Sequence, residues 1–178
     1  EAQQPGARGF RIKGSGQEVL GTTYRCGALT VNSGAISTFM RHTITCENRV
    51  TPIPQAMPLR AAALLGCAVP TGAGIVLNTA KVRVGDTLAV FGLGGVGLNV
   101  VLAAGMAGAS KIIAVDILDP KLEQARALGA THLVNAREED PLAIIRGLTG
   151  GGGVDFAVEA AGRKETMEMA AECVRAAG

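Results

Sequence analysis

Gly92-Leu93-Gly94-Gly95-Val96-Gly97 is a glycine-rich hexapeptide of the form G-x-G-x-x-G, and the residues on either side of it decide the fold. The apolar run Thr87 to Phe91 precedes it, and a segment rich in alanine, valine and leucine follows it. A strand, a glycine turn and a helix in this order are typical of a dinucleotide-binding unit. Gly92 permits the tight turn, Gly94 lets the backbone approach a pyrophosphate, and Gly97 lets helix and strand pack closely.

The acid that ends the next apolar run indicates which dinucleotide fits. Asp116 closes the run Lys111 to Asp116, and its carboxylate can accept hydrogen bonds from both ribose hydroxyls of NAD but would repel a 2′-phosphate. The pyrophosphate would lie at the N-terminus of the helix that starts near Gly95. We therefore predict an NAD site formed by the whole hexapeptide and Asp116. The alternative is a glycine-rich turn with an incidental acid.

Composition sets limits on the class of protein. With 178 residues, 48% hydrophobic residues and a formal charge of +2, the chain is long and apolar enough for the core of an α/β domain. An aromatic content of 3% and the lack of a charge run argue against nucleic acid as a partner. The uncharged stretch Thr87 to Ser110 is interrupted by glycines, which favours a buried strand and a helix over a membrane span. Because no signal sequence opens the chain, we expect a soluble cytoplasmic protein without a membrane partner.

The organisation of the chain changes near residue 70. Residues 19 to 50 are rich in threonine and β-branched residues, which predicts short antiparallel strands, and residues 59 to 65 are expected to begin a short helix. Strands and helices then alternate, as in a parallel sheet. The expected strands are 87–91, 111–116, 132–134 and 154–159, and the expected helices are 96–107, 120–128, 141–148 and 164–176.

The ends of several helices have their own signals. Asp119 and Asp140 each precede a proline, which predicts an N-cap acid followed by proline at the first helical position. Gly129 and Gly178 fit the C-terminal ends of helices. The glycines at 150 to 153 precede a strand, so they are expected to form a flexible loop and not a second phosphate site.

Several segments together carry a resemblance to a known family. They are Gly66 to Gly72, Ala80 to Val82, Val90 to Gly97, Val115-Asp116, Gly129-Ala130 and Gly153 to Phe156. With them the chain resembles the zinc-dependent medium-chain alcohol dehydrogenases from about Gly21 to its last residue. The resemblance implies an α/β fold: a Rossmann-type doubly wound parallel sheet, of which four of six strands are present in the order 3-2-1-4. This NAD-binding domain, residues 71–178, would follow part of a mostly β, GroES-like catalytic domain, residues 1–70.

The resemblance also implies a chemistry and a set of site residues. Catalytic Zn²⁺, held by two cysteines and a histidine, would bind an alcohol as its alkoxide, and hydride would pass to NAD. Cys67 matches a zinc ligand, and Thr71 matches a residue beside the nicotinamide. Lys121 joins Asp116 at the adenosine ribose, and Arg163 approaches the adenine. By residue type and spacing alone, Cys67 would be a small buried apolar side chain, as Cys26, Cys46 and Cys173 are expected to be.

The departures from the family define what is expected of this chain by itself. In the family two further zinc ligands precede the first residue of this chain, and the sheet continues beyond its last. We therefore expect a fragment that is inactive alone, with residues 154–160 as a bare sheet edge that promotes self-association.

For the parent protein we expect an NAD- and zinc-dependent oxidoreductase acting on a primary or secondary alcohol, or on an aldehyde or ketone, as a homodimer or homotetramer. The alternatives are a nucleotide-binding fragment without chemistry, an inactive structural fragment, and a zinc-free NADPH quinone reductase. Cys67 and Asp116 argue against the last of these.

Overall fold

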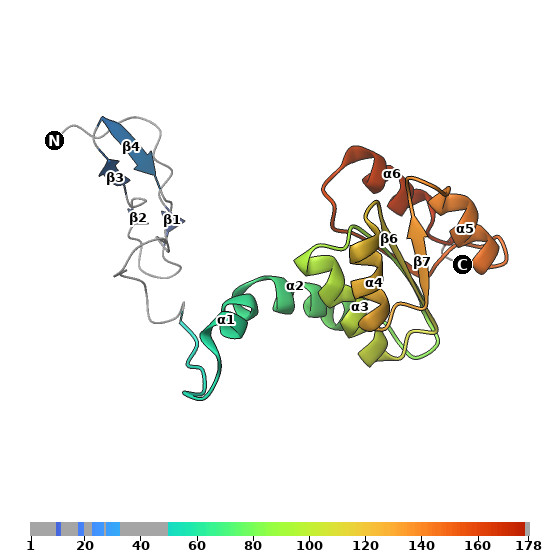
Figure 1. Ribbon diagram of the computed structural model, residues 1–178, viewed down its shortest axis with the longest axis horizontal. Helices are drawn as coiled ribbons and strands as arrows, with labels where there is room; N and C mark the ends of the chain where they lie inside the picture. The colour runs from blue at the N-terminus through green and yellow to red at the C-terminus, as the bar shows by residue number, and fades with distance from the viewer. Residues whose placement is uncertain (1–9, 12–17, 20–22, 27, 33–49, 177–178) are drawn as a thin grey trace. The chain divides into compact units, whose positions relative to one another are not determined.

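The computed structural model describes residues 10–11, 18–19, 23–26, 28–32 and 50–176 (Figure 1). The chain divides into two compact units, Glu1–Gln55 and Ala56–Gly178. In the first unit two antiparallel pairs are described, and they consist of β1 (Phe10–Arg11) with β2 (Glu18–Val19) and β3 (Thr23–Cys26) with β4 (Leu29–Asn32). The β3–β4 pair confirms the antiparallel strands expected within residues 19–50, whereas β1 lies before that range. Residues 33–49 lie outside the described part.

A four-stranded parallel sheet forms the centre of the second unit. Its strands are β5 (Thr87–Phe91), β6 (Lys111–Asp116), β7 (His132–Asn135) and β8 (Phe156–Glu159). The order β7-β6-β5-β8 confirms the expected order 3-2-1-4 and the Rossmann-type fold. In this order β5 lies between β6 and β8. The chain first adds β6 and β7 on one side of β5 and then returns to add β8 on the other side. Such a reversal is where ligands bind in doubly wound folds.

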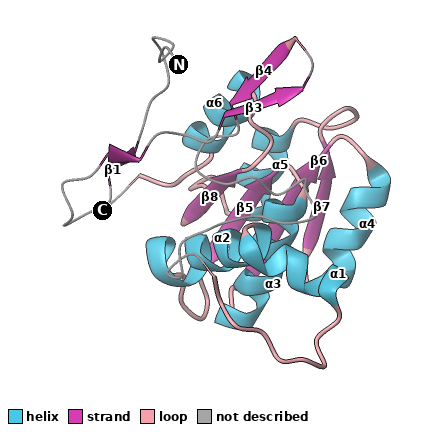
Figure 2. Ribbon diagram, turned by 90° about the vertical axis from the view of Figure 1, so that its left-hand side faces the viewer, coloured by secondary structure: helices cyan, strands magenta, loops and turns pink. Residues whose placement is uncertain are grey.

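Apolar side chains on both faces of the strands explain why the sheet is buried on both sides. Leu88 and Val90 of β5 face one core cluster, and Ala89 and Phe91 face the other. The first cluster includes residues of α3 (Gly95–Ala107) and α4 (Asp119–Ala127), and the second includes residues of α5 (Pro141–Leu148) and α6 (Lys164–Glu172). Figure 2 shows these helices as layers on the two sides of the sheet.

The uncharged stretch from residue 87 to residue 110 forms β5 and α3, as predicted. Within the described residues no single helix is both long and apolar enough to cross a membrane. The helical segments Leu59–Gly66 and Ala68–Ala80 reach such a length only as a pair, and they are bent by 47°.

The helical segment that precedes the sheet belongs to the second unit. It comprises α1 (Leu59–Ala62), the 3-10 turn η2 (Ala63–Gly66), α2 (Ala68–Gly74) and the π-helical η3 (Ile75–Ala80). α2 packs on α3 at Gly72, where a Cβ atom would lie 2.6 Å from Asn99 Cβ and 2.7 Å from the Val96 carbonyl oxygen. Residue 70, after which the domain boundary is expected, lies within α2, and the division into domains 1–70 and 71–178 stays a prediction. The GroES-like character of residues 1–70 stays a prediction.

The two predicted N-cap acids behave differently. Asp140 caps α5, since its Oδ1 accepts hydrogen bonds from Leu142 N at 2.9 Å and Ala143 N at 3.4 Å. The prediction for Asp119 is wrong, because Asp119 is the first residue of α4 and Leu118 occupies the N-cap. The Asp119 carboxylate instead accepts a hydrogen bond from Asn135 Nδ2 on β7 at 2.7 Å. At the other end of α4, Gly129 has φ 109° as expected of a helix stop, and Gly178 lies outside the described residues.

The end of α6 differs from the expectation because the chain turns to pair with the start of the β8 segment. α6 ends at Glu172, and Val174 forms a parallel bridge with Val154. Val154 N donates to Cys173 O and Arg175 N donates to Val154 O, each at 2.9 Å. Gly153, with φ 87°, permits this approach, since a Cβ atom there would lie 2.5 Å from Cys173 O. The helix predicted to reach residue 176 is therefore wrong, and so is the bare edge at Val154, whereas β8 is the last strand in the sheet order, as expected. Self-association stays a prediction.

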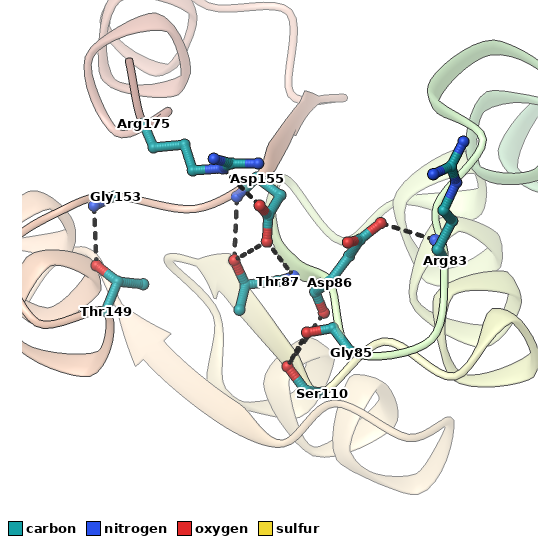
Figure 3. A network of polar contacts seen from close by, with 9 residues as sticks. All are labelled: Arg83, Gly85, Asp86, Thr87, Ser110, Thr149, Gly153, Asp155 and Arg175. Carbon is teal, nitrogen blue, oxygen red and sulfur yellow. Dashed lines mark hydrogen bonds and ion pairs between the residues drawn. The ribbon is translucent and has the colours of Figure 1, made fainter. Parts of the chain in front are cut away.

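A polar cluster at the amino ends of β5 and β8 joins the two strands (Figure 3). Asp155 Oδ2 accepts hydrogen bonds from Thr87 N and Thr87 Oγ1, both at 2.7 Å, and Asp155 N donates to Thr87 Oγ1 at 3.0 Å. Arg175 Nε lies 2.6 Å from Asp155 Oδ1. The Thr87 N–H and hydroxyl, with the Arg175 guanidinium, hold the pKa of Asp155 below its ordinary value of 3.8 although burial opposes this.

We expect Asp155→Asn to lower the free energy of unfolding by about 1.5–3 kcal/mol at pH 7, because charged hydrogen bonds are lost. Since the folded pKa is depressed, the contribution of Asp155 is complete above the unfolded pKa and falls as the pH drops through the folded value. The difference between wild type and variant should therefore shrink below about pH 4. Urea unfolding at pH 7 and at pH 3 measures it, with Glu123→Gln, an exposed carboxylate, as the control. A difference that is equal at both pH values would refute this role.

Candidate functional site

A cleft of about 540 Å³ lies at the carboxyl ends of β5, β6 and β8. Six of the sequence-predicted cofactor contacts line it together: Gly92, Leu93, Gly94, Asp116, Lys121 and Arg163. The other three, Gly95, Val96 and Gly97, form the first turn of α3. The wall on the α6 side includes Glu165, Thr166 and Met169, which the sequence analysis did not single out. They were missed because no local pattern shows that α6 faces this edge of the sheet.

The glycine turn after β5 has little room for side chains at two of its three key positions. Gly92 has φ 90°, and a Cβ atom there would lie 2.6 Å from Ala161 N. A Cβ atom at Gly97 would overlap the carbonyl oxygen of Gly92. Gly94 differs, because no protein atom lies within 4 Å of its Cβ position. The first and last glycines are thus required by the protein itself, whereas the middle one leaves open space at the cleft.

α3 begins at this turn and presents its N-terminus there. Gly94 is the N-cap, no side chain caps the helix, and no acidic residue lies in its first turn. The N–H groups at the start of an α-helix lack intrahelical acceptors, and together with the helix dipole they favour an anion. The arrangement can therefore hold a phosphate group at the open side of Gly94.

Asp116 connects the glycine turn to the turn that follows β6. Its side chain is buried, with 9% of the residue exposed. Oδ2 accepts a hydrogen bond from Leu93 N at 2.8 Å, and Oδ1 accepts from Ile117 N at 2.8 Å and from Leu118 N at 3.1 Å. Lys121 Nζ lies 3.9 Å from Oδ2. A carboxylate has about four acceptor sites, so a ligand hydroxyl can still donate to Asp116.

Glu159 has a similar position at the end of β8. Its Oε1 accepts hydrogen bonds from Ala161 N and Gly162 N, each at 2.8 Å, and from Thr166 Oγ1 at 2.7 Å. Burial opposes ionisation most strongly, but these hydrogen bonds outweigh it and lower the pKa of Glu159. The turn leads into Arg163, the N-cap residue of α6, which lines the cleft.

Cys67 and Thr71 lie beside the glycine turn but outside the cleft lining. Both are exposed, and Thr71 N donates to Cys67 O at 2.9 Å in the first turn of α2. Ala68 Cβ lies 3.3 Å from the Cβ position of Gly95, so α2 and α3 begin next to each other. The alternative of a buried apolar Cys67 is therefore wrong. Cys173, by contrast, is buried as expected, and burial raises the pKa of its thiol to about 11.

The described residues do not complete a zinc site. In the ranges 50–176 and the short strands before them, no three His, Cys, Asp or Glu side chains are grouped to hold a metal ion. Cys46 and the side chain of Cys26 lie outside the described part. The assignment of Cys67 as a zinc ligand stays a prediction.

A parallel sheet with helices on both faces, and a glycine turn opening into a cleft at the point where strand order reverses, defines the class of doubly wound, Rossmann-like domains. Within that class, residues 95–178 match the family model described as zinc-binding dehydrogenase. Residues 95–178 therefore belong to a zinc-binding dehydrogenase domain of the medium-chain dehydrogenase/reductase superfamily, as the resemblance to alcohol dehydrogenases implied.

Solved structures of alcohol dehydrogenases are similar to this chain. An alcohol dehydrogenase zinc-binding domain protein from Burkholderia ambifaria is 42% identical, with a TM-score of 0.74, over 79% of this chain and 38% of that one. Benzyl alcohol dehydrogenase from Acinetobacter calcoaceticus is 39% identical, with a TM-score of 0.71, over 75% and 36%. An alcohol dehydrogenase from Thermus sp. ATN1 is 37% identical, with a TM-score of 0.65, over 70% and 36%. The chain thus spans less than 40% of the length of each of these proteins.

Proposed function

We propose that this chain provides the NAD-binding part of an oxidoreductase that transfers a hydride between NAD and a primary or secondary alcohol, or the corresponding aldehyde or ketone. One observation carries the proposal. The buried carboxylate of Asp116, the uncrowded Gly94 and the uncapped N-terminus of α3 meet at a single cleft. These groups fit the ribose hydroxyls and the pyrophosphate of a dinucleotide.

Different residues of the cleft would bind different parts of NAD. The first-turn N–H groups of α3 would bind the pyrophosphate, and Asp116 would accept a hydrogen bond from a hydroxyl of the adenosine ribose at its remaining acceptor site. Lys121, whose ammonium lies 3.9 Å from Asp116 Oδ2, would stay close to that ribose, and Arg163 would form the wall near the adenine. When bound, NAD supplies the acceptor for a hydride.

The proposal extends to a catalytic zinc in the whole enzyme, with Cys67 as one ligand and Thr71 beside the nicotinamide. A catalytic zinc needs three protein ligands and an open fourth position. Of the three ligands that the resemblance implies, the described residues contain Cys67 alone, and they group no three side chains that could hold a metal ion. They therefore do not fit the metal by themselves, and we derive no chemical step through it. A nucleotide-binding chain without chemistry is the second candidate. Its mark would be NAD binding without turnover by the whole protein in the presence of Zn²⁺ and alcohol.

We expect Asp116→Asn to weaken NAD binding about tenfold and to narrow the preference for NAD over NADP, because the negative charge that repels a 2′-phosphate is lost. Asparagine keeps only one acceptor oxygen, so at least one of the backbone N–H groups bonded to Asp116 loses its acceptor, and some stability is lost as well. Alanine would leave the N–H groups of Leu93, Ile117 and Leu118 without an acceptor, and would therefore also destabilise the fold. Calorimetric titration with each dinucleotide measures both effects.

Asp119→Asn is the matched control for this change, since Asp119 is an exposed acid on the same turn and does not line the cleft. It should leave both dissociation constants unchanged. An Asp116→Asn variant that binds NAD as tightly as wild type would remove Asp116 from the proposed site.

A further inference from the structure

The strands on either side of β5 both end in an acid whose carboxylate is bonded to backbone N–H groups. Asp116 ends β6 and holds Leu93 N of the glycine turn directly. Glu159 ends β8 and holds N–H groups of the turn formed by residues 160–163. The parallel suggests that both carboxylates position the segments around the glycine turn.

The turn that Glu159 holds lies against the glycine turn itself. Ala160 N donates to Phe91 O at 2.8 Å, at the residue just before Gly92. A Cβ atom on Gly92 would lie 2.6 Å from Ala161 N and 2.8 Å from Ala161 Cα. Because the two backbones are this close, a shift of the 160–163 turn must also move Gly92 or open the cleft wall.

Glu159 is also the link between this turn and α6. The hydroxyl of Thr166 donates a hydrogen bond to Glu159 Oε1 at 2.7 Å. The carbonyl oxygen of Arg163, 2.9 Å from Thr166 Oγ1, is an alternative acceptor for the same hydroxyl. Ala161, Arg163 and Thr166 all line the cleft. One carboxylate oxygen is therefore bonded to both the 160–163 turn and the start of α6, which line one side of the cleft. The lowered pKa of Glu159 agrees with an ionised acceptor there.

We propose that Glu159 is a positioning residue for the nucleotide site, which holds the 160–163 turn and the start of α6 against the glycine turn. This inference rests on the proposed NAD site. Glu159 does not itself line the cleft, so it acts through the residues that it holds.

Three variants test this role. Glu159→Ala removes every bond, Glu159→Gln keeps an acceptor oxygen without the charge, and Thr166→Val removes only the hydroxyl donor. Glu168→Gln is the control, because Glu168 is an exposed glutamate of α6 paired with Lys164 and does not line the cleft. The readouts are amide hydrogen exchange at Ala161 and Gly162, followed by NMR, and the dissociation constant of NAD, followed by calorimetry.

We expect Glu159→Ala to weaken NAD binding about tenfold and to speed exchange at Ala161 and Gly162, while the amides of β5 and β6 stay protected. Glu159→Gln should recover part of both effects, and Thr166→Val should weaken binding less than Glu159→Ala. If Glu159→Ala does not fold, the other two variants decide the matter.

The outcomes separate this inference from the proposed function. Faster exchange at the turn with unchanged NAD affinity in all three variants would overturn the positioning role and leave the NAD site in place. A wild-type chain that does not bind NAD would overturn the proposed function. In that case unchanged exchange at Ala161 and Gly162 in Glu159→Ala would also show that Glu159 does not hold the turn.

Discussion

Gly97→Ala should destabilise the second unit by about 3 kcal/mol or more, the largest stability effect that we expect from a single methyl group in this chain. The added Cβ would overlap the carbonyl oxygen of Gly92 and lie 3.5 Å from Val90 Cγ1. Neither the strand nor the helix can yield easily. Val90 and Val100 are fully buried on the two elements that meet here.

The measurement for Gly97→Ala is the urea midpoint at pH 7, and Gly105→Ala in the same helix is its control. The Cβ position of Gly105 has Ile112 Cδ1 at 3.9 Å, an ordinary contact. Alanine there should stabilise the helix by about 0.5–1 kcal/mol, because it replaces glycine in a helix interior. If Gly97→Ala unfolds at the same urea concentration as wild type, the close packing of α3 on the turn is not what requires this glycine.

Gly94→Ala should leave the stability of the fold unchanged but weaken the binding of NAD, whereas Gly97→Ala should destabilise the fold. No protein atom lies within 4 Å of its Cβ position, and its φ of −77° and ψ of −168° are accessible to alanine. The urea midpoint should therefore stay the same or rise slightly. We expect NAD binding to weaken by about tenfold or more, because the methyl group takes the space through which the backbone approaches the pyrophosphate.

Isothermal calorimetry with NAD, beside the urea midpoint of the same sample, checks the Gly94→Ala prediction. Gly105→Ala again serves as a glycine-to-alanine control, because it lies on α3 away from the cleft lining. Tight NAD binding by Gly94→Ala would show that the open space at this glycine is not used by a phosphate.

Much of the fold could be predicted because its signals are local. The runs at 87–91 and 111–116 are apolar throughout and were found with their correct ends, since a strand buried on both faces leaves a continuous signal. The glycine hexapeptide identified the β5–α3 turn, and from it the resemblance gave the strand order. Asp140 was recognised as a cap because the pattern of acid and proline is contained in adjacent residues.

The errors and omissions share a different physical origin, namely contacts between distant segments. Asp119 has the same local pattern as Asp140, but its carboxylate binds Asn135 on the neighbouring strand. α6 ends at Glu172, before the predicted residue 176, because Val174 forms a β-bridge with Val154. The bond from Leu93 N to Asp116 and the bond from Ala160 N to Phe91 O depend on the order of strands in the sheet. No spacing along the chain reveals them.

Calorimetric titration of wild type and Gly94→Ala with NAD and NADP, with and without Zn²⁺, tests whether the glycine turn and Asp116 form an NAD site. We expect saturable NAD binding by wild type that does not depend on zinc, weaker binding of NADP, and a loss of NAD affinity in Gly94→Ala at an unchanged urea midpoint. Wild-type protein that is folded yet binds neither dinucleotide, or equal NAD affinity in both proteins, would contradict this site.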